Sequence, residues 1–167
     1  MSRKLTVYGW VGYRRECPKA ANGGQQTREV VAATSQKAAA RAAGEEQPRR
    51  LFNLGTTENE EEIEVAMAHP GVVFWHPLDQ RGPGRWRRAG EMEDRDPEQE
   101  WKDLPSRLKV ALRCTDEDGR WRDAAHGLDA LRWGLIESRE PPKHHLTEIG
   151  EALAKIAHER WEAGLED

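Results

Sequence analysis

One stretch, residues 130–153, constrains the fold more than any other part of the chain. Gly134 stands where a helix commonly ends with a residue of positive φ, and Leu135-Ile136 then begins an apolar strand. Pro141-Pro142 disfavours helix and favours a turn. Thr147 is a good N-cap for a new helix, because its hydroxyl can accept an unpaired amide proton of the first turn. The stretch therefore predicts a helix end, a β-hairpin and a following helix.

The segments on either side extend this pattern into a helical module. Apolar residues at helical spacing predict helices over 101–104 and 106–113. A longer helix is expected over 120–133, and a closing helix over 147–163. The core stripe of the helix over 120–133 is expected to be Trp121, Ala124, Leu128 and Leu131.

This order of elements resembles the second half of a bacterial winged-helix domain, as found in MarR-like and PadR-like regulators. The Gly-Leu-Ile step at 134–136 and the Leu-Thr-x-x-Gly pattern at 146–150 carry the resemblance, which covers residues 104–160. It implies that 120–133 is a recognition helix, that the hairpin is a wing and that the closing helix forms a dimer surface. Winged helices either bind DNA or contact other proteins, so both functions stay open.

The N-terminal part predicts two strands followed by two short helices. β-branched and aromatic residues favour strands over 5–13 and 27–34, although the second segment also fits the start of a helix. Ser35 is an N-cap for a helix over 36–43, and a shorter helix is expected over 49–54. Together they predict a helix-turn-helix-like pair; the alternative is two short helices packed on a sheet with solvated arginines. The arginines concerned are Arg41, Arg49 and Arg50.

The next segment adds a third helix and a second pair of strands. Thr57 or Asn59 can cap a helix with Glu60–Glu62 in its first turn, which we interpret as a solvated face that complements the helix dipole. Residues 72–76 are a continuous β-forming run, and 85–88 supply a hairpin partner. The residues expected to face inward from the helix are Ile63, Ala66 and Met67.

Charge patterning suggests a domain boundary. Residues 89–100 carry seven charges and no apolar period, so 91–100 is expected to be an acidic linker. The predicted fold class is α+β. A domain over 1–90 has a small antiparallel sheet with short helices, including the helix-turn-helix-like pair, and a winged-helix-like domain follows over 101–167.

The N-terminal domain also resembles small, largely uncharacterised proteins encoded by actinobacterial phages. The resemblance runs over 35–77 and is carried by Asn53, by the Gly-Thr-Thr-Glu-Asn-Glu step from Gly55, and by the Pro-Gly-Val-Val-Phe-Trp run at 70–75. It implies a phage origin and brings no activity with it.

The net charge of −4 is unevenly distributed. Residues 1–56 carry 10 Lys/Arg against 4 Asp/Glu, whereas 57–100 carry 5 against 12. Residues 101–146 are nearly balanced, with 9 against 8. Because phosphate binding needs locally concentrated positive charge, the N-terminal third fits it better than the winged-helix-like module does.

The residues expected to contact DNA are basic side chains of the two helical motifs and the wing. Asp123 and Asp129 share the surface of the expected recognition helix and would repel phosphate, so a protein-contact or structural role for that face is equally open. The predicted contact set is Arg41, Arg49, Arg50, Arg120, Arg122, His126, Arg132, Arg139, Lys143 and His144.

No catalytic or cofactor-binding motif is present. The sequence contains no GxSxG, P-loop or HExxH pattern, so we expect a non-enzymatic protein without metal or cofactor. Cys17 and Cys114 are far apart in sequence, which is typical of reduced thiols. No apolar run approaches the roughly 20 residues that cross a bilayer, and the N-terminus lacks a signal-peptide pattern. A cytoplasmic location without membrane contact is therefore expected.

Two functions are compatible with these patterns. The first is a phage-type transcriptional regulator that binds double-stranded DNA, with the C-terminal helix available for homodimer formation. The second is a protein-interaction module that binds and modulates a host protein without nucleic acid. DNA binding requires a continuous face of unpaired cations, whereas a protein-contact module predicts an exposed apolar patch.

Overall fold

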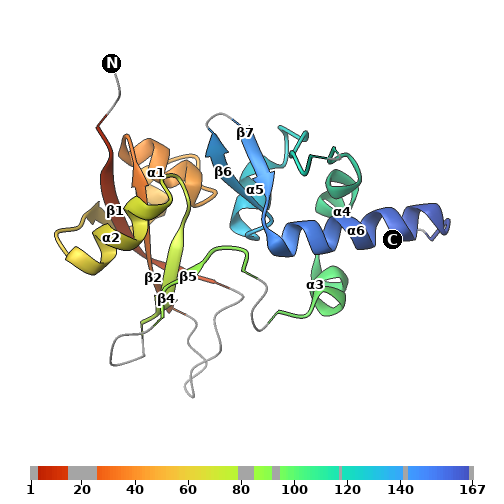
Figure 1. The fold of residues 1–167 in the computed structure, drawn as a ribbon, viewed down its shortest axis with the longest axis horizontal. Helices are drawn as coiled ribbons and strands as arrows, with labels where there is room; N and C mark the ends of the chain where they lie inside the picture. Colours follow the sequence, from red (N-terminus) through yellow and green to blue (C-terminus); the bar gives the residue numbers. More distant parts are fainter. Residues whose placement is uncertain are drawn as a thin grey trace. The chain divides into compact units, whose positions relative to one another are not determined.

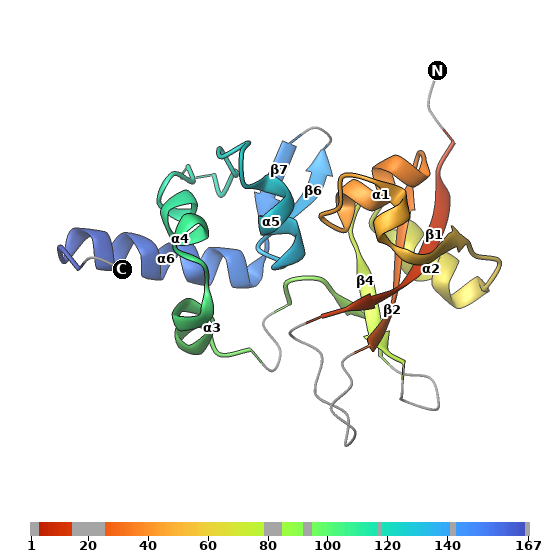
Figure 2. The ribbon, with the colours of Figure 1, turned by 180° about the vertical axis from the view of Figure 1, so that it is seen from behind.

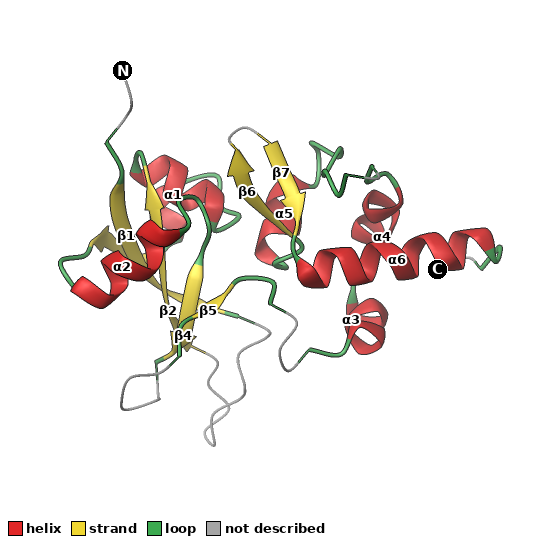
Figure 3. Cartoon of the chain, viewed as in Figure 1, coloured by secondary structure: helices red, strands yellow, loops and turns green. Residues whose placement is uncertain are grey.

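The α+β class is confirmed in a computed structural model, which forms two compact units, unit 1 over residues 1–89 and unit 2 over 90–167 (Figure 1). Among the described residues the chain contains a five-stranded antiparallel sheet, a two-stranded hairpin and six α-helices (Figure 3). The described residues are 4–14, 26–78, 85–91, 95–116, 118–140 and 143–165.

Unit 1 is built around an antiparallel sheet with the strand order β3-β1-β2-β4-β5. Two α-helices and one 3-10 turn, η1, connect the strands. In chain order the elements are β1 (Thr6–Tyr13), β2 (Gln26–Ala33), α1 (Gln36–Ala42), η1 (Pro48–Arg50), β3 (Phe52–Thr56), α2 (Glu60–Ala68), β4 (Phe74–Pro77) and β5 (Arg87–Arg88).

The two helices of unit 1 cover opposite faces of the sheet. Helix α2 lies in front of the sheet in Figure 1, and α1 lies in front in the reverse view of Figure 2. Val30 and Ala32 pack with Ala66 of α2, whereas Val31 packs with Ala39 of α1. Because successive side chains of a strand point to opposite faces, this arrangement buries the whole Val30–Ala33 run of the central strand.

Local capping signals set the helix boundaries in unit 1 as the sequence predicts. The Ser35 hydroxyl accepts the amide of Ala38 at 3.1 Å, and Gly44 follows α1 at a φ of 81°. The Asn59 side chain accepts the amide of Glu62 at 3.2 Å. These bonds satisfy backbone groups that the helix itself leaves unpaired.

The prediction of a short helix over 49–54 is wrong. Only η1 is helical, and Phe52–Thr56 forms strand β3 at the edge of the sheet, opposite Gly9 and its neighbours in β1. An isolated helix of this length is weakly stable, whereas pairing with β1 supplies partners for the backbone of β3. Asn53 has a φ of 56°, and the β1–β3 register shifts at this point as a β-bulge. Unit 1 therefore has no helix-turn-helix pair among its described residues.

The prediction of which residues of the third helix face inward is also wrong in part. Helix α2 buries Ala66 as predicted, but Ile63 and Met67 are exposed and Glu62 is buried instead. The helix is rotated toward Glu62 because Arg28 on the central strand provides that carboxylate with a partner. The interpretation of all three first-turn glutamates as a solvated face therefore fails for Glu62.

Unit 2 places two short helices against one long one. Helices α3 and α4 both pack on α6, and the core includes Trp101, Leu108, Leu135 and Leu153. The predicted hairpin is present as β6 and β7, and Arg120 forms a further antiparallel bridge to His145 in β7. The elements are α3 (Pro97–Asp103), α4 (Ser106–Arg113), α5 (Gly127–Arg132), β6 (Ile136–Glu140), β7 (Lys143–Leu146) and α6 (Glu148–Glu162).

The two sequence motifs of unit 2 meet at the start of α6. The Thr147 hydroxyl donates to the carbonyl of Gly134 and accepts the amide of Gly150 at 3.3 Å, while the Thr147 amide donates to the carbonyl of Leu135 at 2.9 Å. A Cβ on Gly150 would lie 2.0 Å from the carbonyl oxygen of Leu135. The glycine therefore allows α6 to approach the first strand of the hairpin.

Two expected boundaries in unit 2 need correction. The helix expected over 120–133 is reduced to α5, because the Asp123 carboxylate accepts the amides of Ala125 and His126 and closes a turn instead. The expected acidic linker over 91–100 is also too long. Asp96 caps α3 by accepting the amide of Glu98 at 3.0 Å, so helix begins at Pro97.

Candidate functional site

The basic residues predicted in unit 1 are exposed, and no described residue forms an ion pair with them. Arg41 lies in the last turn of α1, and Arg49 and Arg50 lie in η1, which packs next to α1. Lys37 is one helical turn before Arg41 on the same side of α1. Within the part of the chain that the structure describes, none of these four side chains has an ion pair or hydrogen bond. We call Lys37, Arg41, Arg49 and Arg50 the α1–η1 cluster.

Acidic residues next to the α1–η1 cluster reduce its charge only in part. Glu45 and Glu46 lie in the link between α1 and η1, and Glu45 is half-buried with an interaction of its own. The segment from Lys37 to Arg50 therefore carries four cations and two acids. It keeps a net positive charge on exposed side chains, which is the condition for attracting phosphate.

The cations predicted on the helix expected over 120–133 are paired with acids instead. The Arg122 Nε lies 3.0 Å from Asp116, and the His126 Nδ1 lies 2.8 Å from Asp123. Each acid of these pairs is held ionised. The amide of Arg120 chiefly lowers the pKa of Asp116, and the hydrogen bond with His126 chiefly lowers the pKa of Asp123.

The remaining helix cation shares its acid with another arginine. Arg132 lies 3.5 Å from the Asp129 carboxylate, which also accepts Arg107 Nε at 2.8 Å. The predicted face of α5 therefore presents ion pairs rather than unpaired positive charge. This local neutralisation disfavours phosphate contact by α5.

The last predicted residues lie on or beside the hairpin. Lys143 is exposed and has no side-chain partner among the described residues. Arg120 and His144 are half-buried, and His144 has an interaction within the fold. The side chain of Arg139 lies outside the described residues. Of this group, Lys143 is the side chain best placed to reach a polyanion.

Two exposed aromatic rings lie on the α2 face of the sheet, near the η1 end of the α1–η1 cluster. Phe52 directly follows η1 and is 68% exposed, and Tyr13 at the end of β1 is 67% exposed. Phe52 pairs with Val11, which lies two residues before Tyr13. Both rings therefore lie on the same face of the sheet, since residues i and i+2 of a strand and directly paired residues share a face.

The sequence interpretation missed both aromatic residues as candidate contacts. Tyr13 continues an alternation through Val7 and Val11 that marks one face of β1. That signal was available in the sequence. The position of Phe52 could not be predicted, because its segment was expected to be helical. Its neighbour on β1 is determined by the register of the sheet.

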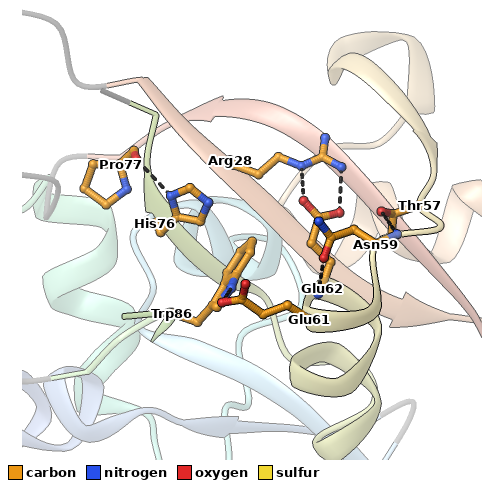
Figure 4. Close-up of polar contacts among 8 residues, drawn as sticks. All are labelled: Arg28, Thr57, Asn59, Glu61, Glu62, His76, Pro77 and Trp86. Atoms are coloured by element: carbon orange, nitrogen blue, oxygen red, sulfur yellow. Dashed lines mark hydrogen bonds and ion pairs between the residues drawn. The ribbon is translucent and has the colours of Figure 1, made fainter. Parts of the chain in front are cut away.

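A polar cluster occupies the same face, beneath the start of α2 (Figure 4). Arg28 donates two hydrogen bonds to Glu62, each at 2.8 Å. Beside it, the Trp86 indole donates to Glu61 at 3.0 Å and meets the His76 ring edge-on at 4.5 Å between centroids. A Cβ at Gly9 would lie 2.4 Å from the Arg28 guanidinium, so glycine makes room for this ion pair over β1.

The balance of forces at Glu62 favours its ionised form. Burial raises the pKa of the Glu62 carboxyl, but hydrogen bonds from Arg28 and Thr57 and the positive charge of Arg28 more than offset this effect. The pKa therefore lies below its ordinary value of 4.5. Because the folded-state pKa is depressed, the ion pair stabilises the fold above about pH 4.5, and this stabilisation is lost as pH falls through the folded-state pKa.

Replacing Glu62 by glutamine is expected to lower the free energy of unfolding by about 1.5–3 kcal/mol at neutral pH, the usual contribution of hydrogen bonds to a charged group. The difference from the wild type should shrink as the pH falls below 4.5, the ordinary pKa of the carboxyl. Urea unfolding at neutral pH and at pH values below 4.5 measures the loss of stability and its pH dependence. Glu64→Gln on the exposed side of α2 is the matched control and should change little. A pH-independent loss at Glu62 would contradict the assignment.

The described residues contain no group of three or more His, Cys, Asp and Glu side chains placed to hold a metal ion. Among the same residues, no helix has the length and apolar character needed to span a bilayer. Comparison with known proteins finds no family model that matches the chain, no similar curated protein and no similar solved structure.

Proposed function

We propose that the protein is a non-enzymatic DNA-binding protein of the phage regulator type, which contacts the phosphate backbone through the α1–η1 cluster. The observation that supports this function is the set of four exposed cations without a side-chain partner among the described residues. Each unpaired Lys or Arg that neutralises a phosphate releases a condensed counterion, and this release drives binding.

Unit 2 supports the proposal through its hairpin more than through its helix. Unit 2 contains, in chain order, a helix, the bridge residue Arg120, a further helix, a hairpin and a closing helix. This order is compatible with a winged-helix-like module. However, a helix-turn-helix needs two helices before the wing, and here only α5 lies between the bridge and the hairpin among the described residues. We therefore assign contact with the DNA backbone to Lys143 of the hairpin. We do not assign recognition of bases to α5.

The decisive experiment is a fluorescence-anisotropy titration of labelled duplex DNA at salt concentrations from about 50 to 200 mM. Replacing Arg41, Arg49 and Arg50 together by alanine should weaken binding and reduce the slope of log affinity against log salt by about 3, because each lost phosphate contact removes about 0.9.

The matched control removes the same number of cations from ion pairs. Replacing Arg107, Arg122 and Arg132 by alanine changes the net charge equally, yet it should leave the salt slope nearly unchanged. Equal effects of the two triple variants would show that total charge, and not the α1–η1 cluster, governs binding. The proposal would then be wrong.

A second function, a protein-interaction module that modulates a host protein, is favoured by exposed apolar side chains in unit 2. Val110 of α4 and Trp161 of α6 are exposed, as is Leu165 beyond the end of α6. The Arg113 guanidinium lies over the Trp161 ring at 5.2 Å. Exposed apolar patches commonly mark protein contacts, including contacts between copies of one chain. A failure to retain duplex DNA at any salt concentration would favour this function.

A further inference from the structure

We propose that unit 1 binds single-stranded nucleic acid, whose bases stack on Tyr13 and Phe52 while its phosphates meet Arg49 and Arg50 of the α1–η1 cluster. This inference rests on the proposed function and names the form of nucleic acid that the same surface prefers. It concerns a pair of aromatic side chains to which the predicted contact set assigned no role.

The sheet register places the two rings side by side. Val11 on β1 pairs with Phe52 on β3 and with Arg28 on β2, so these three side chains form one row across the face. Tyr13 is two residues further along β1 and belongs to the same face. Diagonal neighbours on adjacent strands are about 7–8 Å apart, which is within reach of aromatic side chains. The two rings can therefore form one stacking surface.

The exposure of these rings contrasts with the burial of two other aromatic residues in the unit. Trp10 and Trp75, also on strands of this sheet, are almost completely buried. Burying an aromatic side chain is strongly favourable. Two neighbouring rings at 67% and 68% exposure therefore leave a large apolar area in contact with water in the free protein. A flat ligand that covers them would remove this area from water.

The charges around the rings favour a polyanion as this ligand. Arg49 and Arg50 precede Phe52 by three and two residues, so their backbones lie within about 10 Å of it. Both guanidiniums are unpaired among the described residues. Of the three acids in the first turn of α2, Glu62 is neutralised by Arg28, whereas Glu61 accepts only the uncharged Trp86 indole and keeps its charge. The attraction for phosphate therefore comes from Arg49 and Arg50.

A single strand fits this combination better than a duplex does. In a duplex the bases are stacked on each other, so a sheet face can reach little beyond the phosphates. In a single strand every base offers its π face to an aromatic side chain, and a groove or patch of cations follows the backbone. Stacking of this kind tolerates any base, so we expect weak sequence preference.

The test compares three labelled probes with the full-length protein, by anisotropy at low salt: a thymine single strand, an abasic strand with the same number of phosphates, and a duplex of the same length. The thymine strand should bind about tenfold or more tightly than the abasic strand, because stacking contributes substantially at each base. Replacing Tyr13 and Phe52 together by alanine should remove this preference, and Tyr13→Phe with Phe52→Trp should restore it.

The matched control replaces two exposed apolar side chains elsewhere in unit 1, Ile63→Ala with Met67→Ala, and should leave the preference unchanged. If the abasic strand binds as tightly as the thymine strand, or if the Tyr13 and Phe52 variant keeps the preference, the stacking inference fails while the phosphate-binding function stands. If no probe binds at low salt, the proposed function fails and the stacking inference fails with it.

Discussion

Replacing Gly150 by alanine is expected to unfold unit 2 well below the melting temperature of the wild type. The added Cβ would lie 2.0 Å from the carbonyl oxygen of Leu135, an atom of the backbone that cannot rotate away. Relief would require α6 to move off the first strand of the hairpin, which opens the core around Ile149 and Leu153. Overpacking costs about 1–3 kcal/mol in ordinary sites and more in severe ones, so we expect about 3 kcal/mol or more.

For a unit of this size, such a loss lowers the melting temperature by about 12–24 °C. Circular dichroism or calorimetry measures the shift. Gly127→Ala is the matched control, because the same methyl group meets no atom within 4 Å at the first position of α5. Alanine is the better helix former, so this control should change stability by no more than about 1 kcal/mol, in the stabilising direction. Similar melting temperatures for the two variants would contradict the packing assigned to Gly150.

The second large effect is expected from replacing Arg14 by methionine. Arg14 and Glu29 form a buried ion pair at 3.1 Å, with only 6% and 4% of the residues exposed. Thr27 also donates to the Glu29 carboxylate at 2.9 Å, and a Cβ at Gly12 would lie 2.1 Å from it. Removing the arginine leaves a carboxylate enclosed without its counter-charge, and breaking a buried pair in this way costs about 3–5 kcal/mol.

Denaturant unfolding of Arg14→Met measures this cost. In the double variant with Glu29→Gln the buried charge is absent, so part of the lost stability should return. Arg107→Met tests the specificity of the effect, since its pair with Asp129 is largely exposed, and exposed pairs contribute only about 0–1 kcal/mol. A loss at Arg14 no larger than the loss at Arg107 would show that the buried pair does not stabilise unit 1 as argued.

Features governed by short-range chemistry were predictable from the sequence. The caps at Ser35, Asn59 and Thr147 each bond a backbone amide three residues away. The positive φ of Gly134 and the hairpin after it also follow from nearby residues. In each of these cases the interacting groups are close in sequence, so the residue types alone indicate the structure.

The elements that were predicted wrongly depend on contacts between distant residues. Strand β3 exists because β1 pairs with it, and nothing local in Phe52–Thr56 distinguishes a short strand from a short helix. Helix α2 is rotated because Arg28, 34 residues away, binds Glu62. The helix expected over 120–133 shows the opposite case, since its apolar spacing is helical but the side chain of Asp123 stabilises a turn.

The candidate site was predictable only as a list of cations. Whether a cation is available to bind phosphate depends on the acids placed beside it in the fold. Arg107 and Asp129 are 22 residues apart in sequence and yet form a close pair, whereas Arg41 remains unpaired among the described residues although Glu45 is four residues away. That Tyr13 and Phe52 are diagonal neighbours on one face likewise becomes visible only through the register of the sheet, which pairs Phe52 with Val11.

The bulge at Asn53 has a consequence for how unit 1 behaves toward other copies of itself. An edge strand with regularly spaced amides and carbonyls is a template on which another chain can extend the sheet. The left-handed backbone of Asn53 interrupts that spacing at the second residue of β3, and irregular edges of this kind disfavour in-register addition. The edge at β3 therefore disfavours addition of a strand from another copy of the chain.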